Sequence, residues 1–317
     1  MYTVVVVGCG QLGSRYIQGL RKIALPLSIF VVDPSARSLE KARALWNAAQ
    51  EDTPINEISW FSDISFLPSE IDLAIISTTA KHRCVIVESI ARRHLVKYWV
   101  LEKVLAQSTQ ELERMRDSLV SSDASWVNTP RRMMSWHQSL KAELTTSKPL
   151  QVSRSGSDWG LACNSIHFID LIAWWTDETV KSIDVSGLEK NWHRSKRLGF
   201  YEIFGSLAVE FSFGSTLLLN ASADSIDRGI DVLGNQKDWN IDEAKGHAIS
   251  SRGQKSYGKL ELQSEMTECL VTQILTKGTC ELPTYIVSMP MHMLLIDQLL
   301  YHWNNANNRT DLILPIT

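Results

Sequence analysis

Three glycines near the N-terminus have the types and spacing that bind a dinucleotide. Gly8, Gly10 and Gly13 form a Gly-x-Gly-x-x-Gly series between an apolar run and a segment of helical periodicity. In that context the first glycine permits a tight turn, the second lets backbone N–H groups approach a pyrophosphate, and the third lets the helix lie close to the strand. A helix N-terminus attracts anions, so we expect Gln11 and Leu12 to contact the cofactor as well.

An acidic residue after the second apolar run favours NAD as that cofactor. Asp33 follows Gly13 by twenty residues, where a carboxylate can hold the ribose 2′-hydroxyl of the adenosine half. A 2′-phosphate would be repelled by Asp33, although Arg37 could partly compensate, so NADP stays open. The alternative is a tight turn without a cofactor, in which Asp33 is only a carboxylate before Pro34; the order of strand, glycines, helix, strand and acid argues against it.

A lysine and a histidine further along the chain could serve hydride transfer. Transfer between a carbinol carbon and nicotinamide needs a group that takes or gives the hydroxyl proton. A histidine with a near-neutral pKa can do both, and His167 is the candidate. Lys103 follows a predicted strand, where its cation could stabilise a developing alkoxide or hold a hydroxyl. The alternatives are a solvated surface lysine and a satisfied core histidine.

Three blocks of the chain resemble the Gfo/Idh/MocA family of sugar oxidoreductases, named for glucose-fructose oxidoreductase and inositol dehydrogenase. The blocks are residues 76–82, 100–106 and 160–171. Members typically carry a strand that ends in Glu-Lys-Pro. Glu102 and Lys103 match this motif, whereas Val104 replaces the proline, which leaves the peptide geometry open at that position.

The third block resembles the family's Gly-x-x-x-Asp-x-Gly-x-His-x-x-Asp signature. His167 and Asp170 fall in register, whereas Cys163 occupies the usual Asp position and Ser165 the usual Gly position. A thiol is a weaker hydrogen-bond acceptor than a carboxylate and cannot replace it as a proton relay. Either Asn164 or the substrate supplies that contact, or the protein uses a simpler pair of lysine and histidine.

The resemblance implies roles for the matched residues. Lys103 would reach the substrate and the nicotinamide ribose, and His167 would act as general acid or base, with Asp170 orienting it or forming a local pair. Further cofactor contacts are expected from Ser77, Thr78, Thr79, His82 and Glu102, besides Arg37 named above; a role at the N-terminus of its helix is the alternative for His82. Further substrate contacts are expected from Arg131, Trp159, Cys163 and Asn164. An aromatic face suits a sugar ring, and a guanidinium suits a carboxylate or phosphate.

The resemblance also implies a substrate class and an assembly. The block 163–167 is similar to that of a subgroup in bacterial surface-sugar biosynthesis, including nonulosonic acids. The expected substrate is a sugar or sugar derivative, which could be nucleotide-activated. Members commonly associate through the open face of the second-domain sheet, so a homodimer or homotetramer is expected. The identity of the sugar, its reacting carbon and the reaction direction stay open.

The elements that must position these residues begin as an α/β pattern. Short β-branched runs alternate with helix-period segments, which indicates βαβ units and a parallel sheet. Strands are expected at Val4–Val7, Ser28–Val32, Leu73–Ser77, Tyr98–Leu101 and around Trp126–Asn128. Helices are expected around 12–23, 39–49, 86–94 and 108–119. Residues 1–125 are therefore predicted to form an NAD(P)-binding Rossmann domain with a doubly wound parallel sheet.

The pattern changes in the second half of the chain. An apolar helix is expected at about Ser165–Trp175. Closely spaced strands are expected at Ser182–Ser186, Ala208–Phe213, Thr216–Ala221, Gly229–Leu233 and Trp239–Ile241. A hairpin turn is expected at Gly214. Residues 126–317 are predicted to form an α+β domain with a mainly antiparallel sheet, for substrate binding and oligomerisation, with a helix at 286–303 packing near the domain junction.

Composition excludes several other classes. The 317 residues are 44% hydrophobic and 21% charged, which is typical of globular proteins. A formal net charge of −3 argues against a nucleic-acid partner. Five scattered cysteines without a C-x-x-C pair favour reduced thiols, a cytoplasmic location and no metal site. The most apolar stretch, 286–303, is interrupted by proline, histidine and aspartate, so a membrane span is not expected.

These observations predict an NAD(P)-dependent oxidoreductase that acts on CH–OH groups of a sugar. The first alternative is a non-catalytic dinucleotide-binding or redox-sensing protein, because Cys163 stands where the family has an aspartate. The second alternative is an enzyme that retains its cofactor and both oxidises and reduces its substrate within one cycle. Motifs of serine hydrolases, P-loop NTPases and zincins are absent from the sequence.

Overall fold

The computed structural model describes residues 1–48 and 56–317, so residue 49, the end of the second predicted helix, lies outside them. The chain divides into two compact units that interleave along the sequence. The first unit contains 1–105, 110–128 and 261–286, and the second contains 106–109, 129–260 and 287–317. The segment 261–286, which we expected in the second domain, thus groups with the first unit.

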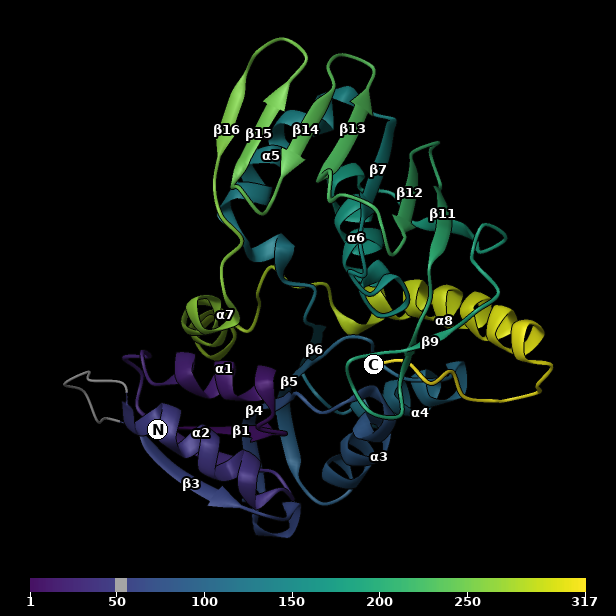
Figure 1. Ribbon diagram of the computed structural model, residues 1–317. Coiled ribbons are helices and arrows are strands. Elements are labelled where there is room, and N and C mark those ends of the chain that lie inside the picture. The colour runs from purple at the N-terminus through teal and green to yellow at the C-terminus, as the bar shows by residue number, and fades with distance from the viewer. Residues whose placement is uncertain (49–55) are drawn as a thin grey trace. The chain divides into compact units, whose positions relative to one another are not determined.

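A six-stranded parallel sheet forms the centre of the first unit (Figure 1). In spatial order its strands are β3 (Glu57–Phe61), β2 (Leu27–Val32), β1 (Tyr2–Val7), β4 (Glu70–Ile76), β5 (Leu95–Leu101) and β6 (Ala124–Val127). This order is that of the dinucleotide-binding sheet, in which strand order reverses beside the first strand. Val4, Val5 and Val6 are fully buried, which explains why the strand is a continuous apolar run rather than an alternating one.

Helices complete the first unit. They are α1 (Gln11–Leu20), α2 (Ala36–Ala48), α3 (Ala80–Ala91), α4 (Thr109–Leu119), α7 (Gln263–Lys277) and the short η1 (Ile64–Phe66). Helix α7 packs on α1, and the approach is close enough that a Cβ on Gly19 would lie 2.6 Å from Cβ of Thr267. The contact recruits a helix from far along the chain to cover α1.

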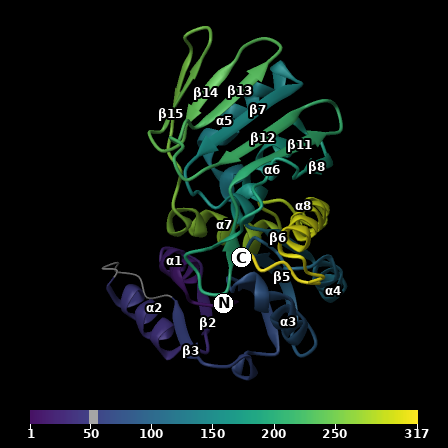
Figure 2. The ribbon, with the colours of Figure 1, turned by 45° about the vertical axis from the view of Figure 1, so that its right-hand side comes forward.

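The second unit is built on an eight-stranded sheet (Figures 1 and 2). In spatial order its strands are β16 (Lys255–Tyr257), β15 (His247–Ser250), β14 (Trp239–Asp242), β13 (Ile230–Gly234), β7 (Leu150–Gly156), β12 (Thr216–Ala221), β11 (Gly205–Phe211) and β8 (Val180–Asp184). Only the β7–β12 pair is parallel. The predicted hairpin is confirmed between β11 and β12, where Gly214 has φ +95°.

Helices α5 (Ser135–Leu144) and α6 (Leu161–Thr176) lie on one face of this sheet (Figure 2). The unit also contains η2 (Pro130–Met133), η3 (Thr145–Ser147) and the hairpin of β9 (His193–Arg194) and β10 (Tyr201–Glu202). Helix α8 (Tyr285–Asn307) corresponds to the helix predicted at 286–303. None of the helices in 1–48 and 56–317 has the length and apolarity needed to cross a bilayer.

Candidate functional site

The glycine turn in the first unit has the close packing that the fingerprint predicts. Gly8 has φ +87°, which favours glycine. A Cβ on Gly13 would lie 1.9 Å from the carbonyl oxygen of Gly8, so α1 can approach β1 only with glycine there. A Cβ on Gly10 would meet nothing within 4 Å. The space beside Gly10 is therefore open, as a backbone that receives a ligand requires.

The start of α1 offers backbone donors to an anion. Gly10 is the N-cap in extended conformation, and no side chain of the described residues caps the helix there. The first N–H groups of a helix have no partner within it, and they suit a pyrophosphate. The Ser77 hydroxyl fixes the turn, because it donates to the carbonyl oxygens of Val7 at 3.2 Å and Gly8 at 2.5 Å. Gln11 is exposed and Leu12 half-buried at this helix start.

Asp33 lies directly after β2, and its carboxylate joins two loops. One oxygen accepts from the backbone N–H of Cys9 at 2.8 Å and the other from that of Ser35 at 2.8 Å. Each carboxylate oxygen has a second lone pair for a hydroxyl donor. Burial and then the nearby Asp33 raise the pKa of the Cys9 thiol to about 12, so this thiol stays protonated. The structure thus brings Asp33 to the glycine turn, while Arg37 is exposed in the first turn of α2.

Glu102 sits in a buried network that sequence reasoning did not foresee. Its Oε1 accepts from Tyr16 Oη at 2.7 Å and from Asn128 Nδ2 at 2.7 Å, and the same amide lies 2.8 Å from Oε1 of Gln263. Burial raises the pKa of Glu102, and these hydrogen bonds oppose the rise. The network ties the end of β5 to α1 and α7, and it leaves the half-buried Lys103 at the carboxyl edge of the sheet.

The remaining predicted cofactor residues also lie at the carboxyl ends of β4 and β5. Ser77, Thr78 and Thr79 form the half-buried turn after β4, and His82 is exposed in the first turn of α3. The Lys103–Val104 peptide bond is cis, which answers the question of geometry that the missing proline left open. All of these side chains belong to the first unit and surround the edge where dinucleotides bind in such sheets.

Helix α6 carries the predicted histidine in the second unit. Its residues are buried except for Cys163, Asn164, His167 and Trp174, which are half-buried. Cys163 and His167 are four residues apart, so they lie on the same helix face. Cys163, Asn164, His167 and Trp174 are therefore the residues of α6 that keep some exposed surface. Among the described residues, no group of three histidine, cysteine, aspartate or glutamate side chains could hold a metal.

Glu202 is a residue at this helix that sequence reasoning missed. It comes from β10, is 6% exposed, and accepts from the backbone N–H groups of Ala162 at 2.8 Å and Cys163 at 3.3 Å. A carboxylate at a helix N-terminus satisfies orphan donors and interacts favourably with the helix dipole. A Cβ on Gly160 would lie 3.2 Å from Oε1 of Glu202 and 3.1 Å from Sγ of Cys163. A carboxylate therefore does lie beside Cys163, although it comes from strand β10 and not from α6 itself.

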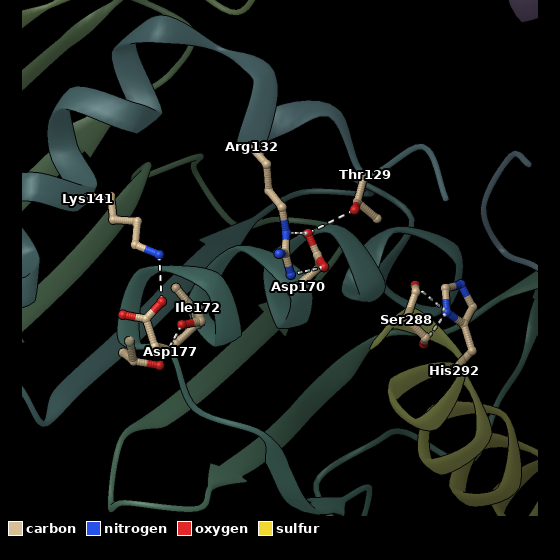
Figure 3. A network of polar contacts seen from close by, with 9 residues as sticks. Thr129, Arg132, Lys141, Asp170, Ile172, Asp177, Ser288 and His292 are labelled. Carbon is tan, nitrogen blue, oxygen red and sulfur yellow. Dashed lines mark hydrogen bonds and ion pairs between the residues drawn. The ribbon is translucent and has the colours of Figure 1, made fainter. Parts of the chain in front are cut away.

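Asp170 is engaged by groups outside α6 (Figure 3). Arg132 donates to both of its oxygens, at 2.6 and 2.8 Å, and Thr129 Oγ1 donates at 2.8 Å. Asp170 is 1% exposed. Burial raises its pKa, and the charge and hydrogen bonds of Arg132 oppose the rise. Of the two roles predicted for Asp170, the structure shows a pair, but with Arg132 of η2.

The other predicted substrate residues form a compact cluster in the second unit. Arg131 makes a bidentate ion pair with Glu243 at 2.7 and 2.8 Å, and its guanidinium lies 4.6 Å from the ring centre of Phe168. Trp159 Nε1 donates to the carbonyl of residue 220 at 2.9 Å, and Asn164 Nδ2 donates to the carbonyl of Trp159 at 2.7 Å. The charge of Arg131 is thus already balanced within the chain.

Comparison with known proteins identifies the fold. No protein-family model matches the chain, and no curated protein matches it. Solved structures do match the chain. An oxidoreductase of Agrobacterium radiobacter with NAD+, L-tartaric acid and magnesium has a TM-score of 0.72 at 15% identity, with 98% of each chain covered. The WlbA dehydrogenase of Bordetella pertussis with NADH and UDP-GlcNAcA has a TM-score of 0.69 at 13% identity, with 96% of each chain covered.

A third solved structure extends the comparison. Scyllo-inositol dehydrogenase of Lactobacillus casei with NAD(H) and scyllo-inositol has a TM-score of 0.67 at 15% identity, with 98% of each chain covered. The likeness covers both units of the chain. The predicted fold, a Rossmann sheet followed by an α+β part with a mainly antiparallel sheet, is therefore confirmed as the fold of these three solved structures.

Proposed function

We propose that the protein is an NAD-dependent oxidoreductase that acts on a hydroxyl- or keto-bearing carbon of a sugar or sugar derivative. The observation that carries the proposal is the glycine turn, in which Gly8 and Gly13 are sterically required, Gly10 is open and Asp33 is joined to the turn through Cys9. The three similar structures contain NAD+ or NADH, and two of them also contain UDP-GlcNAcA or scyllo-inositol. NADP is the weaker alternative because of the carboxylate of Asp33.

The chain's own residues would divide the work as follows. The N–H groups at the start of α1 bind the pyrophosphate, and Asp33 accepts from the adenosine ribose. Bound nicotinamide supplies the hydride acceptor or donor. His167 Nε2 or Nδ1 takes the proton of the reacting hydroxyl in oxidation and returns it in reduction. The Lys103 ammonium stabilises negative charge that develops on the substrate in the transition state.

Glu202 and Asp170 would serve this chemistry indirectly. Glu202 fixes the first turn of α6, and the pair of Asp170 with Arg132 fixes its middle. His167 lies between these two anchor points on the helix. A helix anchored on both sides of His167 fixes the backbone position from which the imidazole reaches the substrate, and proton transfer depends on such positioning. This arrangement supports a catalytic helix even though Cys163 replaces the signature's aspartate.

Turnover on a substrate panel tests the proposal. Purified protein is incubated with NAD+ or NADH and with neutral sugars, sugar acids and nucleotide sugars, and absorbance of the reduced nicotinamide is followed. Lys103→Met and His167→Gln should each lower kcat by at least about 100-fold. The matched controls are Lys41→Met and His247→Gln, at side chains outside the proposed machinery. Tight NAD binding without turnover on any panel member would instead favour the non-catalytic alternative.

Self-association through the sheet of the second unit is part of the proposal. Leu218, Leu233 and Ile249 are 42%, 52% and 42% exposed and line one hollow on the sheet. Exposed apolar patches of this kind mark interaction sites. Light scattering of the wild type should give a dimer or tetramer, and Leu218→Lys should lower the measured molecular mass.

The cytoplasmic location and a role in surface-sugar biosynthesis stay predictions.

A further inference from the structure

Arg83 is a buried cation at the carboxyl edge of the parallel sheet. It follows His82 in α3, and it is only 1% exposed. Its Nη1 donates to the carbonyl oxygens of Val104 and Leu105, the latter at 3.1 Å, and its Nη2 donates to the carbonyl oxygen of Thr78. One guanidinium thus joins the turn that follows β4 to the segment that follows β5.

Both joined segments belong to the proposed cofactor and lysine machinery. Thr78 packs on the glycine turn, since a Cβ on Gly8 would lie 3.0 Å from the backbone N of Thr78. Val104 is bonded to Lys103. Arg83 therefore links the backbone beside the glycine turn to the backbone that carries the lysine, and a planar guanidinium with five donors can hold several carbonyl groups in fixed geometry.

Opposite charge accompanies these hydrogen bonds of Arg83. A buried cation is costly unless charge and hydrogen bonds compensate it. Arg83 attracts the buried carboxylate of Glu102 and so opposes the rise in the pKa of that carboxyl that burial causes. Glu102 is in turn held by Tyr16 and Asn128. Residues on both sides of Lys103, Glu102 before it and Val104 after it, are therefore fixed by buried polar contacts.

We propose that Arg83 is a positioning residue that fixes the backbone of Lys103 relative to the turn at Thr78, and so sets where the lysine ammonium meets the substrate. The inference rests on the proposed function. Arg83 itself does not touch the reacting atoms. Misplacement of a catalytic group by about 1 Å can cost roughly 100-fold in rate, which sets the size of the expected effect.

Steady-state kinetics with three variants test the proposal. Arg83→Met should lower kcat by about 100-fold and should raise the NAD dissociation constant by a much smaller factor, because the N–H groups at the start of α1 stay in place while the turn at Thr78 loses one contact. Arg83→Lys should recover part of kcat, since an ammonium can donate to two of the three carbonyl groups. The control is Arg114→Met, which removes an exposed arginine paired with Glu88. Normal kcat per folded molecule in Arg83→Met would overturn the proposal.

A second readout does not depend on turnover. Reductive methylation with ¹³C-formaldehyde labels the lysines, and Lys103→Met assigns the Lys103 resonance. In Arg83→Met this resonance should shift, whereas in Arg114→Met it should match the wild type. An unchanged resonance in Arg83→Met would contradict positioning. If the wild type is inactive on every substrate, the proposed function fails, but the NMR result still tests whether Arg83 positions Lys103. Failure of this inference and failure of the proposed function can therefore be told apart.

Discussion

Arg132 and Asp170 form a bidentate ion pair in which Nη2 lies 2.6 Å from one carboxylate oxygen and Nε lies 2.8 Å from the other. The side chains are 12% and 1% exposed. Asp170 follows His167 by three residues on α6, so the pair attaches η2 to the helix that presents the histidine. Under the proposed function, Asp170, the acid nearest to His167 in sequence, would therefore act by holding the helix.

Removal of Arg132 should destabilise the protein strongly. Arg132→Met leaves the carboxylate of Asp170 buried without its cation, which costs about 3–5 kcal/mol when a buried pair is broken. The free energy of unfolding is measured with urea at pH 7. Thr129→Val is the matched control, because it removes only one hydrogen bond to the same carboxylate and should cost about 1 kcal/mol. A loss below about 1 kcal/mol in Arg132→Met would show that the pair does not hold the helix.

Most of the parallel sheet was predictable because the residues of each strand are enough to identify it. β1, β2, β4 and β5 are mostly buried and read as apolar runs. The predicted runs fall within β1, β2 and β5, and the run Leu73–Ser77 extends one residue past the end of β4. β3 (Glu57–Phe61) was not predicted, because it is a half-exposed edge strand with a mixed sequence. In the eight-stranded sheet of the second unit, β7 was missed because the charged Arg154 interrupts its sequence. The folded chain balances that charge with Asp227, 73 residues away.

The candidate site was predictable where its residues are neighbours in sequence. The glycine turn, Asp33, Lys103 and His167 follow from short motifs. Glu202, Arg83 and Asn128 were not predictable, because each acts on a partner that only the folded chain brings near. Glu202 reaches the start of α6 from about 40 residues further on, and Asn128 links Glu102 to Gln263. No local pattern of residue types encodes such contacts.

The two last glycines of the turn should respond differently to alanine. Gly13→Ala places a Cβ 1.9 Å from the carbonyl oxygen of Gly8, so α1 must move away from β1, and both the melting temperature and NAD binding should fall. Gly10→Ala meets no atom within 4 Å, so the fold should keep its melting temperature. Its methyl group would instead obstruct the ligand, and the NAD dissociation constant should rise by about ten-fold or more.

Calorimetry and fluorescence titration of both variants check this difference. The informative result is the contrast, because each variant adds the same single methyl group three residues apart. Unchanged NAD affinity in Gly10→Ala would mean that the pyrophosphate does not lie at this turn. An unchanged melting temperature in Gly13→Ala would mean that α1 and β1 are not packed as the structure describes.

Glu243 should make stability depend on acid pH. Burial raises its pKa, but Arg131 and His137 more than offset this effect, so the pKa lies well below its usual value. The unfolded state then binds the proton more readily than the folded state. The stability that this group provides is fully present above about pH 4.3, the ordinary pKa of glutamate, and is lost as the pH falls toward the lower folded pKa.

Urea titrations of the wild type and Glu243→Gln at several pH values check this dependence. At pH 7 the variant should be less stable by about 3–5 kcal/mol, because Arg131 loses its buried partner. The difference should shrink as the pH falls from about 4 to 2, because the wild-type carboxylate also becomes protonated. A difference that stays constant over this range would assign the effect to packing rather than charge.

Asp33 should decide between the two dinucleotides. Asp33→Ser removes the negative charge beside the adenosine ribose but keeps a hydroxyl that can accept from the backbone N–H of Cys9. NAD should bind about ten-fold more weakly, and NADP should bind more tightly than in the wild type, because repulsion of the 2′-phosphate is relieved and the exposed Arg37 can pair with it.

The double variant Asp33→Ser, Arg37→Ala is the control, since it should lose the gain in NADP affinity and keep the loss in NAD affinity. Dissociation constants from nicotinamide fluorescence measure both cofactors on each protein. If Asp33→Ser weakens both dinucleotides equally, the carboxylate serves only to hold the glycine turn, and the preference for NAD must come from elsewhere in the first unit.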